Sequence, residues 1–188
     1  FKHLDVVPAT PELAGAEVEL IDHPNRDRAM RNALQPVRDQ YDYILIDCPP
    51  SLSLLTVNML AAADALLIPV QCEYYALEGL SQLLNTVHLV QRSVNADLAI
   101  DGVLLTMYDA RLNLSRQVAA EAREYFGGEV FETVIPRNVR LAEAPSFGKP
   151  IILYDVASVG AQAYMGVAKE LLTRTSSLKK EHTRTAVA

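Results

Sequence analysis

Two kinds of hydrophobic pattern alternate along the 188-residue chain. Short, nearly continuous apolar runs are typical of buried strands, and they predict strands at residues 4–8, 41–47, 64–70, 100–108 and 129–136. Apolar residues that recur every three or four positions predict helices at residues 11–20, 25–39, 51–63, 76–90, 114–126 and 158–172, with a short helix or turn at 138–148. Thr10, and Ser51 or Ser53, are placed to cap two of these helices.

The order of these elements indicates the fold class. Strands and helices alternate, and the connections between strands are too long for hairpins. We therefore expect an α/β fold, a doubly wound and mostly parallel sheet with helices on both faces. The run at 64–70 is apolar enough to predict a strand that is buried on both faces. Residues 1–172 should form this domain, and the polar segment 173–188, which lacks periodicity, should be a disordered tail.

Composition narrows the class of partner. A net charge of −6 and a pI of about 5.2 exclude a uniformly basic nucleic-acid-binding protein, but they leave room for a local basic patch. No apolar stretch reaches the roughly 18 residues that span a bilayer. Cys48 and Cys72 lack the spacing of a redox or zinc motif, and we expect both to be small buried residues. Because the chain starts at Phe1, we expect it to be the later part of a longer protein.

A carboxylate stands at the tip of the second predicted strand, in the stretch YDYILIDCPPSLSLL. Apolar residues lead to Asp47, and two prolines then end the strand. Ligands of open parallel sheets bind outside the carboxyl ends of the strands, where a carboxylate can hold Mg²⁺ beside a nucleotide phosphate. The pattern by itself fits equally well an aspartate that only caps the next turn.

The chain resembles the ParA/Soj family of partition ATPases in four segments: YDYILIDCPPSL, IPVQCEYYALEGLSQLLNTV, GVLLTMYDAR and VIPRNVRLAEAPSFGKPIILYD. The resemblance covers almost all of residues 4–172, in order and without gaps. It implies a P-loop NTPase-like fold and a homodimer that forms with ATP and Mg²⁺. It also implies non-specific DNA binding and ATP hydrolysis that a ParB-like protein stimulates. The expected location is the cytoplasm, at the nucleoid, and no membrane partner is expected.

The phosphate loop of that family is absent from this chain. Gly148 and Lys149 form its one GK pair, but Pro150 follows where a P-loop needs Ser or Thr, and Glu143 stands where it needs the first glycine. Backbone N–H groups and a lysine supply most of the affinity for a triphosphate. We therefore expect no ATPase activity from this chain alone, and the resemblance assigns the activity to the full-length protein.

The adenine end of the nucleotide site should lie within this chain. The resemblance implies that Pro136, Arg137 and Asn138 pack on the base, because proline can cover the ring and the asparagine amide can both donate and accept. Met107, at the end of the preceding strand, would supply a second wall. Without the resemblance, the same residues describe an ordinary turn.

Two arginines are candidate DNA ligands. Arg111 and Arg140 follow adjacent predicted strand ends, and the resemblance implies that both contact DNA phosphates. Arg116 and Arg137 are possible companions. Taken singly, surface arginines are more often solvated charges or weak ion pairs.

Two alternatives to a partition ATPase stay open. A MinD-like positioning ATPase should end in an amphipathic membrane-binding helix, and LKKEHTRTAVA has no apolar stripe. A non-enzymatic scaffold would keep the sheet and a partner surface without any phosphate loop.

Overall fold

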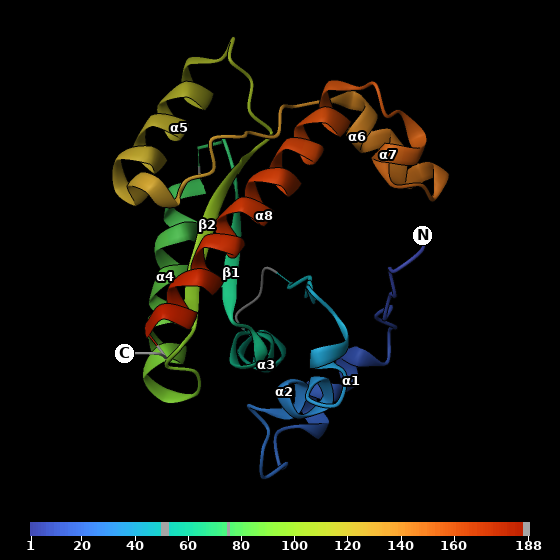
Figure 1. Cartoon of the computed structure of the whole chain (residues 1–188), viewed down its shortest axis with the longest axis vertical. Coiled ribbons are helices and arrows are strands. Elements are labelled where there is room, and N and C mark those ends of the chain that lie inside the picture. The colour runs from blue at the N-terminus through green and yellow to red at the C-terminus, as the bar shows by residue number, and fades with distance from the viewer. Residues whose placement is uncertain (50–52, 75, 186–188) are drawn as a thin grey trace. The chain divides into compact units, whose positions relative to one another are not determined.

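The computed structural model describes residues 1–49, 53–74 and 76–185 (Figure 1). The chain forms two compact units. The first unit comprises Phe1–Asp64 and Leu84–Leu98, and the second comprises Ala65–Leu83 and Ala99–Ala188. Helix α4, Ala76–Ser93, contributes residues to both units.

The first unit is helical. It contains α1 (Leu13–Glu19), α2 (Ala29–Leu34), a short 3-10 helix (Arg38–Gln40) and α3 (Leu54–Ala62). Two buried asparagines, Asn58 and Asn95, hydrogen-bond α3 to neighbouring segments of this unit. The Asn58 side chain, 2% exposed, donates to the Arg26 carbonyl at 2.5 Å and accepts from the Met30 N–H at 3.2 Å. Asn95 donates to the carbonyls of Leu60 and Ala63, at 2.9 and 2.8 Å, and so closes the end of the helix.

The strands predicted at 4–8 and 41–47 are not formed, and this part of the prediction is wrong. Both runs lack strand structure within the described residues, and Val7 and Leu45 are 97% and 83% exposed. An apolar pattern does not suffice for a strand, because the backbone N–H and C=O groups also need a neighbouring strand to pair with. One side-chain contact joins the two runs: Tyr41 donates to Asp5 at 2.7 Å.

Helix starts also differ from the prediction. Glu12 rather than Thr10 occupies the N-cap of α1, and the Thr10 carbonyl accepts from the Leu13 N–H at 3.0 Å. Ser53 does occupy the N-cap of α3, but its hydroxyl makes no capping bond. Ser51, the other candidate cap, lies outside the described residues.

The second unit contains a parallel pair of strands. β1 (Ala65–Gln71) pairs with β2 (Ala99–Thr106), with Val70 opposite Leu105. Residues 130–136 continue the layer beside β2, because the N–H groups of Phe131 and Ile135 donate to the carbonyls of Val103 and Leu105 at 2.9 and 2.8 Å. The predicted strand at 129–136 is therefore present only as two isolated parallel bridges, at Val130 and Pro136.

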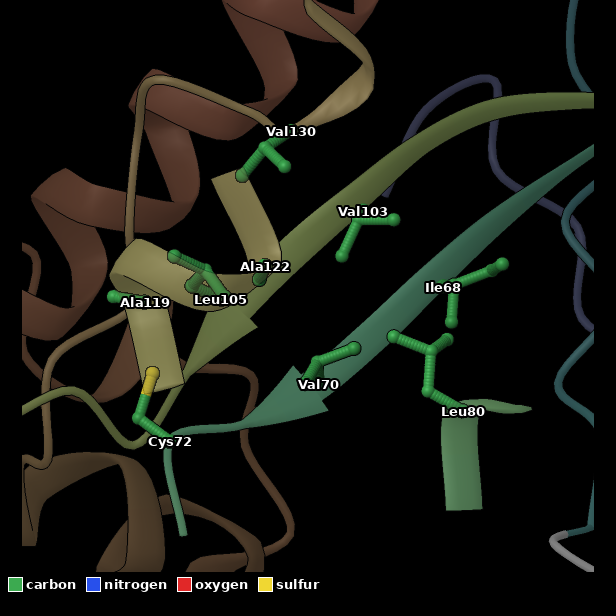
Figure 2. Packing of buried hydrophobic residues seen from close by; sticks show 9 residues of the cluster. All are labelled: Ile68, Val70, Cys72, Leu80, Val103, Leu105, Ala119, Ala122 and Val130. Atoms are coloured by element: carbon green, nitrogen blue, oxygen red, sulfur yellow. The ribbon is translucent and has the colours of Figure 1, made fainter. Parts of the chain in front are cut away.

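Helices cover both faces of β2, as predicted. On one face, side chains from β1, β2, α4 and α5 (Asn113–Phe126) form a cluster with one residue just after β1 and one from the 130–136 segment. Figure 2 shows its members: Ile68, Val70, Cys72, Leu80, Val103, Leu105, Ala119, Ala122 and Val130. On the other face, Leu104 packs with Phe131, Ile135 and Val167 of α8 (Val159–Thr185). The mixed α/β class with a parallel sheet is confirmed.

One face of β1 departs from the prediction of a strand buried on both sides. Ile68 and Val70 are buried, but Leu67 is 38% exposed and Pro69 and Gln71 are exposed. The reason is that α4 and α5 cover only the side of β1 that carries Ile68 and Val70.

The connections after β2 are short helices. Gly127, with φ of 53°, ends α5, as its position in the sequence predicts. A short 3-10 helix (Gly127–Glu129), α6 (Val139–Glu143), a second short 3-10 helix (Ala144–Phe147) and α7 (Ile151–Tyr154) then lead to α8. Helix α8 continues through Thr185 and so includes most of the segment predicted as a tail. In the described part of the chain, no helix has the length and apolarity to cross a membrane.

Gly102 allows β2 to approach the 129–131 segment. A Cβ at this position would lie 2.8 Å from Cδ2 of Phe131 and 2.9 Å from the Glu129 carbonyl oxygen. We expect Gly102→Ala to lower the free energy of unfolding by about 1–3 kcal/mol through overpacking. Urea denaturation measures this change.

Gly79→Ala in α4 is the matched control, since a Cβ there meets nothing within 4 Å. It should leave stability unchanged or raise it by up to about 1 kcal/mol. Equal stabilities for the two variants would show that the Gly102 contact is not close.

Glu170 and Arg174 fasten α8 to the segment after α5. The Glu170 carboxylate accepts from the N–H groups of Glu132 and Thr133 at 2.9 and 3.0 Å, and from Arg174 at 2.9 Å. Arg174 also donates to the Val130 carbonyl at 2.9 Å and lies 4.3 Å from the centre of the Phe131 ring. Burial acts to raise the pKa of Glu170, but these donors outweigh it and lower the pKa below the ordinary 4.5.

This contact predicts a pH-dependent stability. Because the pKa of Glu170 is lower in the folded than in the unfolded chain, its contribution is complete well above pH 4.5 and is lost as the pH falls through the lower folded value. Glu170→Gln replaces one acceptor oxygen with an amide nitrogen, and should cost about 1–3 kcal/mol at pH 7. Urea denaturation at pH 7, 5 and 3 should show that the difference in stability between variant and wild type narrows as the pH falls below 4.5.

Glu124→Gln, on the exposed side of α5, controls for the general removal of one negative charge. A difference in unfolding free energy between Glu170→Gln and wild type that stays constant with pH would contradict a stabilising role of the ionised Glu170 carboxylate.

Candidate functional site at the carboxyl edge of the sheet

Three loops meet where the parallel strands of the second unit end. Glu73 follows β1, Tyr108 follows β2, and Arg137 follows the 130–136 segment. The Arg137 N–H donates to the Tyr108 carbonyl at 3.0 Å, and the Arg137 guanidinium donates to Glu73 at 2.5 Å. This edge is where open α/β sheets bind their ligands.

Met107 has a left-handed backbone, with φ of 52°. This conformation is uncommon for a residue other than glycine. Met107 lies directly before Tyr108, which pairs with the segment around Pro136: the Tyr108 N–H donates to the Ile135 carbonyl at 3.0 Å, and the Tyr108 carbonyl accepts from the Arg137 N–H. The sequence contains no signal for this turn, because methionine does not favour it.

Asn138, in the candidate adenine loop, also caps a helix. It is the N-cap of α6, and its Oδ1 accepts from the Arg140 N–H at 3.0 Å. The amide N–H groups, which this bond does not use, can still donate to a ligand. Pro136 is bridged to Tyr108 in parallel fashion. The structure therefore places the turn Pro136–Asn138 beside Tyr108, the residue after Met107, and the contact of these residues with an adenine stays a prediction.

Arg111 is exposed and is held by a neighbouring acid. Its Nε and one Nη donate to Asp109 at 2.9 and 2.7 Å, and its side chain is 88% exposed. Hydrogen bonds from the Arg111 guanidinium lower the pKa of Asp109 to about 2.

Arg140 lies between two acids. One Nη donates to Glu143 at 3.0 Å, and Nε lies 3.5 Å from Asp155. Tyr154 donates to the same Glu143 oxygen at 3.1 Å. The Arg140 side chain is 54% exposed, so water still screens these ion pairs. Both candidate arginines can reach an outside anion, but neither is unpaired.

Sequence analysis missed these acidic partners. Asp109 stands two residues before Arg111 and Glu143 three residues after Arg140, spacings that can be read from the sequence. Glu73 and Asp155 are farther away along the chain, and only the fold brings them to their arginines.

Asp47 belongs to the first unit, where it is exposed in a segment that forms neither helix nor strand. Among the residues that the structure describes, no three His, Cys, Asp or Glu side chains gather as a metal site. A single carboxylate is still compatible with Mg²⁺, which usually keeps several waters and takes one or two protein carboxylates beside a phosphate.

Gly148 and Lys149 do not form a phosphate loop. Gly148 has φ of 61° and ends the 3-10 helix Ala144–Phe147, where its N–H donates to the Pro145 carbonyl at 2.9 Å. The interpretation of this GK pair as unrelated to nucleotide binding agrees with this turn. For the cysteines, Cys72 is buried as expected, but Cys48 is exposed, since the segment that carries it joins no sheet among the described residues.

Known proteins resemble this chain over most of its length. A family model described as an AAA domain matches residues 1–100. The chromosome partitioning protein ParA of Myxococcus xanthus is 60% identical over 174 residues, which cover 93% of this chain and 62% of that protein. The sporulation initiation inhibitor protein Soj of Bacillus subtilis is 63% identical over 170 residues, 90% of this chain and 67% of that protein.

Solved structures also match the fold of this chain. Cobyrinic acid a,c-diamide synthase from Mycobacterium smegmatis, solved with bound ADP and magnesium, superposes with a TM-score of 0.75 at 36% identity. That match covers 90% of this chain and 62% of the other. The chain thus spans somewhat under two thirds of the length of the M. xanthus relative and of this structure. On the strength of these identities, the chain belongs to the ParA/Soj family of chromosome-partitioning ATPases.

Proposed function

We propose that the full-length protein is a partition ATPase in which ATP binding produces a homodimer that binds DNA without sequence preference. One observation carries the proposal: a chain about 60% identical to partitioning proteins presents two exposed arginines beside loops at the carboxyl edge of its parallel sheet. A ParB-like protein would stimulate hydrolysis and so release the DNA. The protein would act in the cytoplasm, at the nucleoid.

For the nucleotide, the chain would supply the base end and one magnesium ligand. Pro136, Arg137, Asn138 and Met107 would contact the adenine of ATP, the Asn138 amide donating to its polar edge. Asp47 would hold Mg²⁺ through its carboxylate or a water. When bound, this ion would neutralise the charge that develops on the phosphates. The 188-residue chain itself should not turn over ATP.

For DNA, Arg111 and Arg140 would donate to phosphate oxygens. Such contacts give affinity that is independent of base sequence and falls steeply with salt. The overall charge of −6 does not oppose them, because the Debye length at physiological salt is about 8 Å and distant acids are screened.

The test is DNA retention by the full-length protein with ATP and with ADP. We expect a mobility shift of duplexes of unrelated sequence with ATP and Mg²⁺, and a much weaker one with ADP. Phosphate release should be measured in parallel for the full-length protein and for the 188-residue chain. DNA binding that ignores the nucleotide, with no ATP turnover by the full-length protein, would favour a non-enzymatic scaffold instead.

A further inference from the structure

Asp109 accepts three hydrogen bonds from Arg111, more than a simple surface ion pair has. Nε of Arg111 donates to Oδ1 at 2.9 Å, an Nη donates to Oδ2 at 2.7 Å, and the Arg111 backbone N–H donates to Oδ1 at 3.0 Å. Both carboxylate oxygens are engaged by the planar guanidinium. Such bidentate pairs fix the direction of the arginine as well as its distance.

The two side chains differ sharply in exposure. Asp109 is 13% exposed, whereas Arg111 is 88% exposed. Asp109 is also anchored in the second unit. Its N–H donates to the hydroxyl of Ser115 at 3.0 Å, Ser115 is 1% exposed on α5, and the Asp109 carbonyl accepts from the Leu112 N–H at 3.0 Å. The carboxylate is therefore the fixed end of the pair and the guanidinium is the end that faces solvent.

This arrangement leaves the guanidinium with donors to spare. Of its five N–H groups, the pair with Asp109 uses one on Nε and one on an Nη. We propose that Asp109 is a positioning residue for DNA binding: it holds Arg111 so that the remaining N–H groups face a DNA phosphate. The inference rests on the proposed function, in which Arg111 contacts DNA.

If only net charge mattered, neutralising Asp109 would change the DNA affinity in the opposite direction from that expected of a positioning residue. An acid this close to a phosphate ligand should repel DNA, so neutralising it should tighten binding. If Asp109 positions Arg111, neutralising it frees a long side chain that must be ordered again when DNA binds. Ordering one such side chain costs enough to weaken binding by about 2- to 10-fold. The sign of the effect therefore decides between the two accounts.

The experiment measures DNA affinity of the full-length protein with ATP, at several salt concentrations. Asp109→Asn should weaken binding by about 2- to 10-fold. The dependence of log K on log salt should stay close to that of the wild type, because Arg111 keeps its charge and still neutralises its phosphate once DNA is bound. Glu124→Gln removes the same charge from an exposed site on α5 and should leave affinity unchanged or slightly higher. Far-ultraviolet circular dichroism and thermal unfolding check that the variants fold.

A double-mutant cycle separates positioning from a general effect on the structure. In an Arg111→Ala background, Asp109→Asn should change affinity no more than Glu124→Gln does. Arg111→Lys keeps the charge but cannot form the bidentate pair, and its affinity should fall toward that of Arg111→Ala. Wild-type affinity in the lysine variant would contradict the positioning role even if Asp109→Asn fails to fold.

The outcomes distinguish this inference from the proposed function. If Arg111→Ala binds DNA as the wild type does, the DNA contact itself is wrong. If Arg111→Ala binds weakly while Asp109→Asn matches the Glu124→Gln control, or Arg111→Lys matches the wild type, Arg111 contacts DNA without help from Asp109 and the positioning role is overturned.

Discussion

Reversing the charge of Arg111 and Arg140 together is expected to weaken DNA binding by the full-length protein by about 100-fold or more at low salt. The reason is the number of phosphates that these arginines would neutralise. If each arginine meets one phosphate in each half of a dimer, the salt slope should become shallower by roughly 0.9 for every phosphate no longer neutralised. In Arg111→Glu, Arg140→Glu, each new carboxylate also repels the phosphate directly, and Arg140 already shares its surroundings with Glu143 and Asp155.

Fluorescence anisotropy with a labelled duplex, repeated from about 50 to 200 mM salt, measures both quantities. Arg31→Glu, Arg92→Glu is the matched control. It makes the same change in net charge at exposed positions on α2 and α4 in the first unit. An equal weakening of DNA binding in the two double variants would mean that overall charge, and not this surface, sets the affinity.

Asp47→Asn is expected to lower ATP hydrolysis by the full-length protein by about 10²–10³-fold, the usual cost of removing one electrostatic contact to a transition state. Asparagine keeps the size of the side chain but lacks the negative charge that a hard cation prefers. Turnover should recover in part at high Mg²⁺ concentration, because the weakened site is then refilled by mass action.

Phosphate release over a Mg²⁺ titration measures this effect. Asp42→Asn removes a charge from the same exposed segment and serves as the control. Turnover by Asp47→Asn that equals the control at every Mg²⁺ concentration would assign Asp47 to the turn that follows it, the alternative that the pattern alone left open.

The strands show how far a hydrophobic pattern can be trusted. The runs at 64–70 and 100–108 became β1 and β2, because each packs buried side chains against α4 or α5 and each has the other as a hydrogen-bonding neighbour. The runs at 4–8 and 41–47 look similar in the sequence but remain exposed, because they have no strand beside them in the described structure. Strand formation depends on a partner that is remote in sequence.

The sequence by itself determined the family, the α/β class, the helices around β1 and β2, and the end of α5 at Gly127, because these depend on local pattern, turn chemistry and long matching segments. Only the tertiary structure decided which acids hold the arginines, the left-handed turn at Met107, and the meeting of three loops at one sheet edge. Those features join residues up to 64 positions apart, and no periodicity along the chain encodes which distant side chains a packed core brings together.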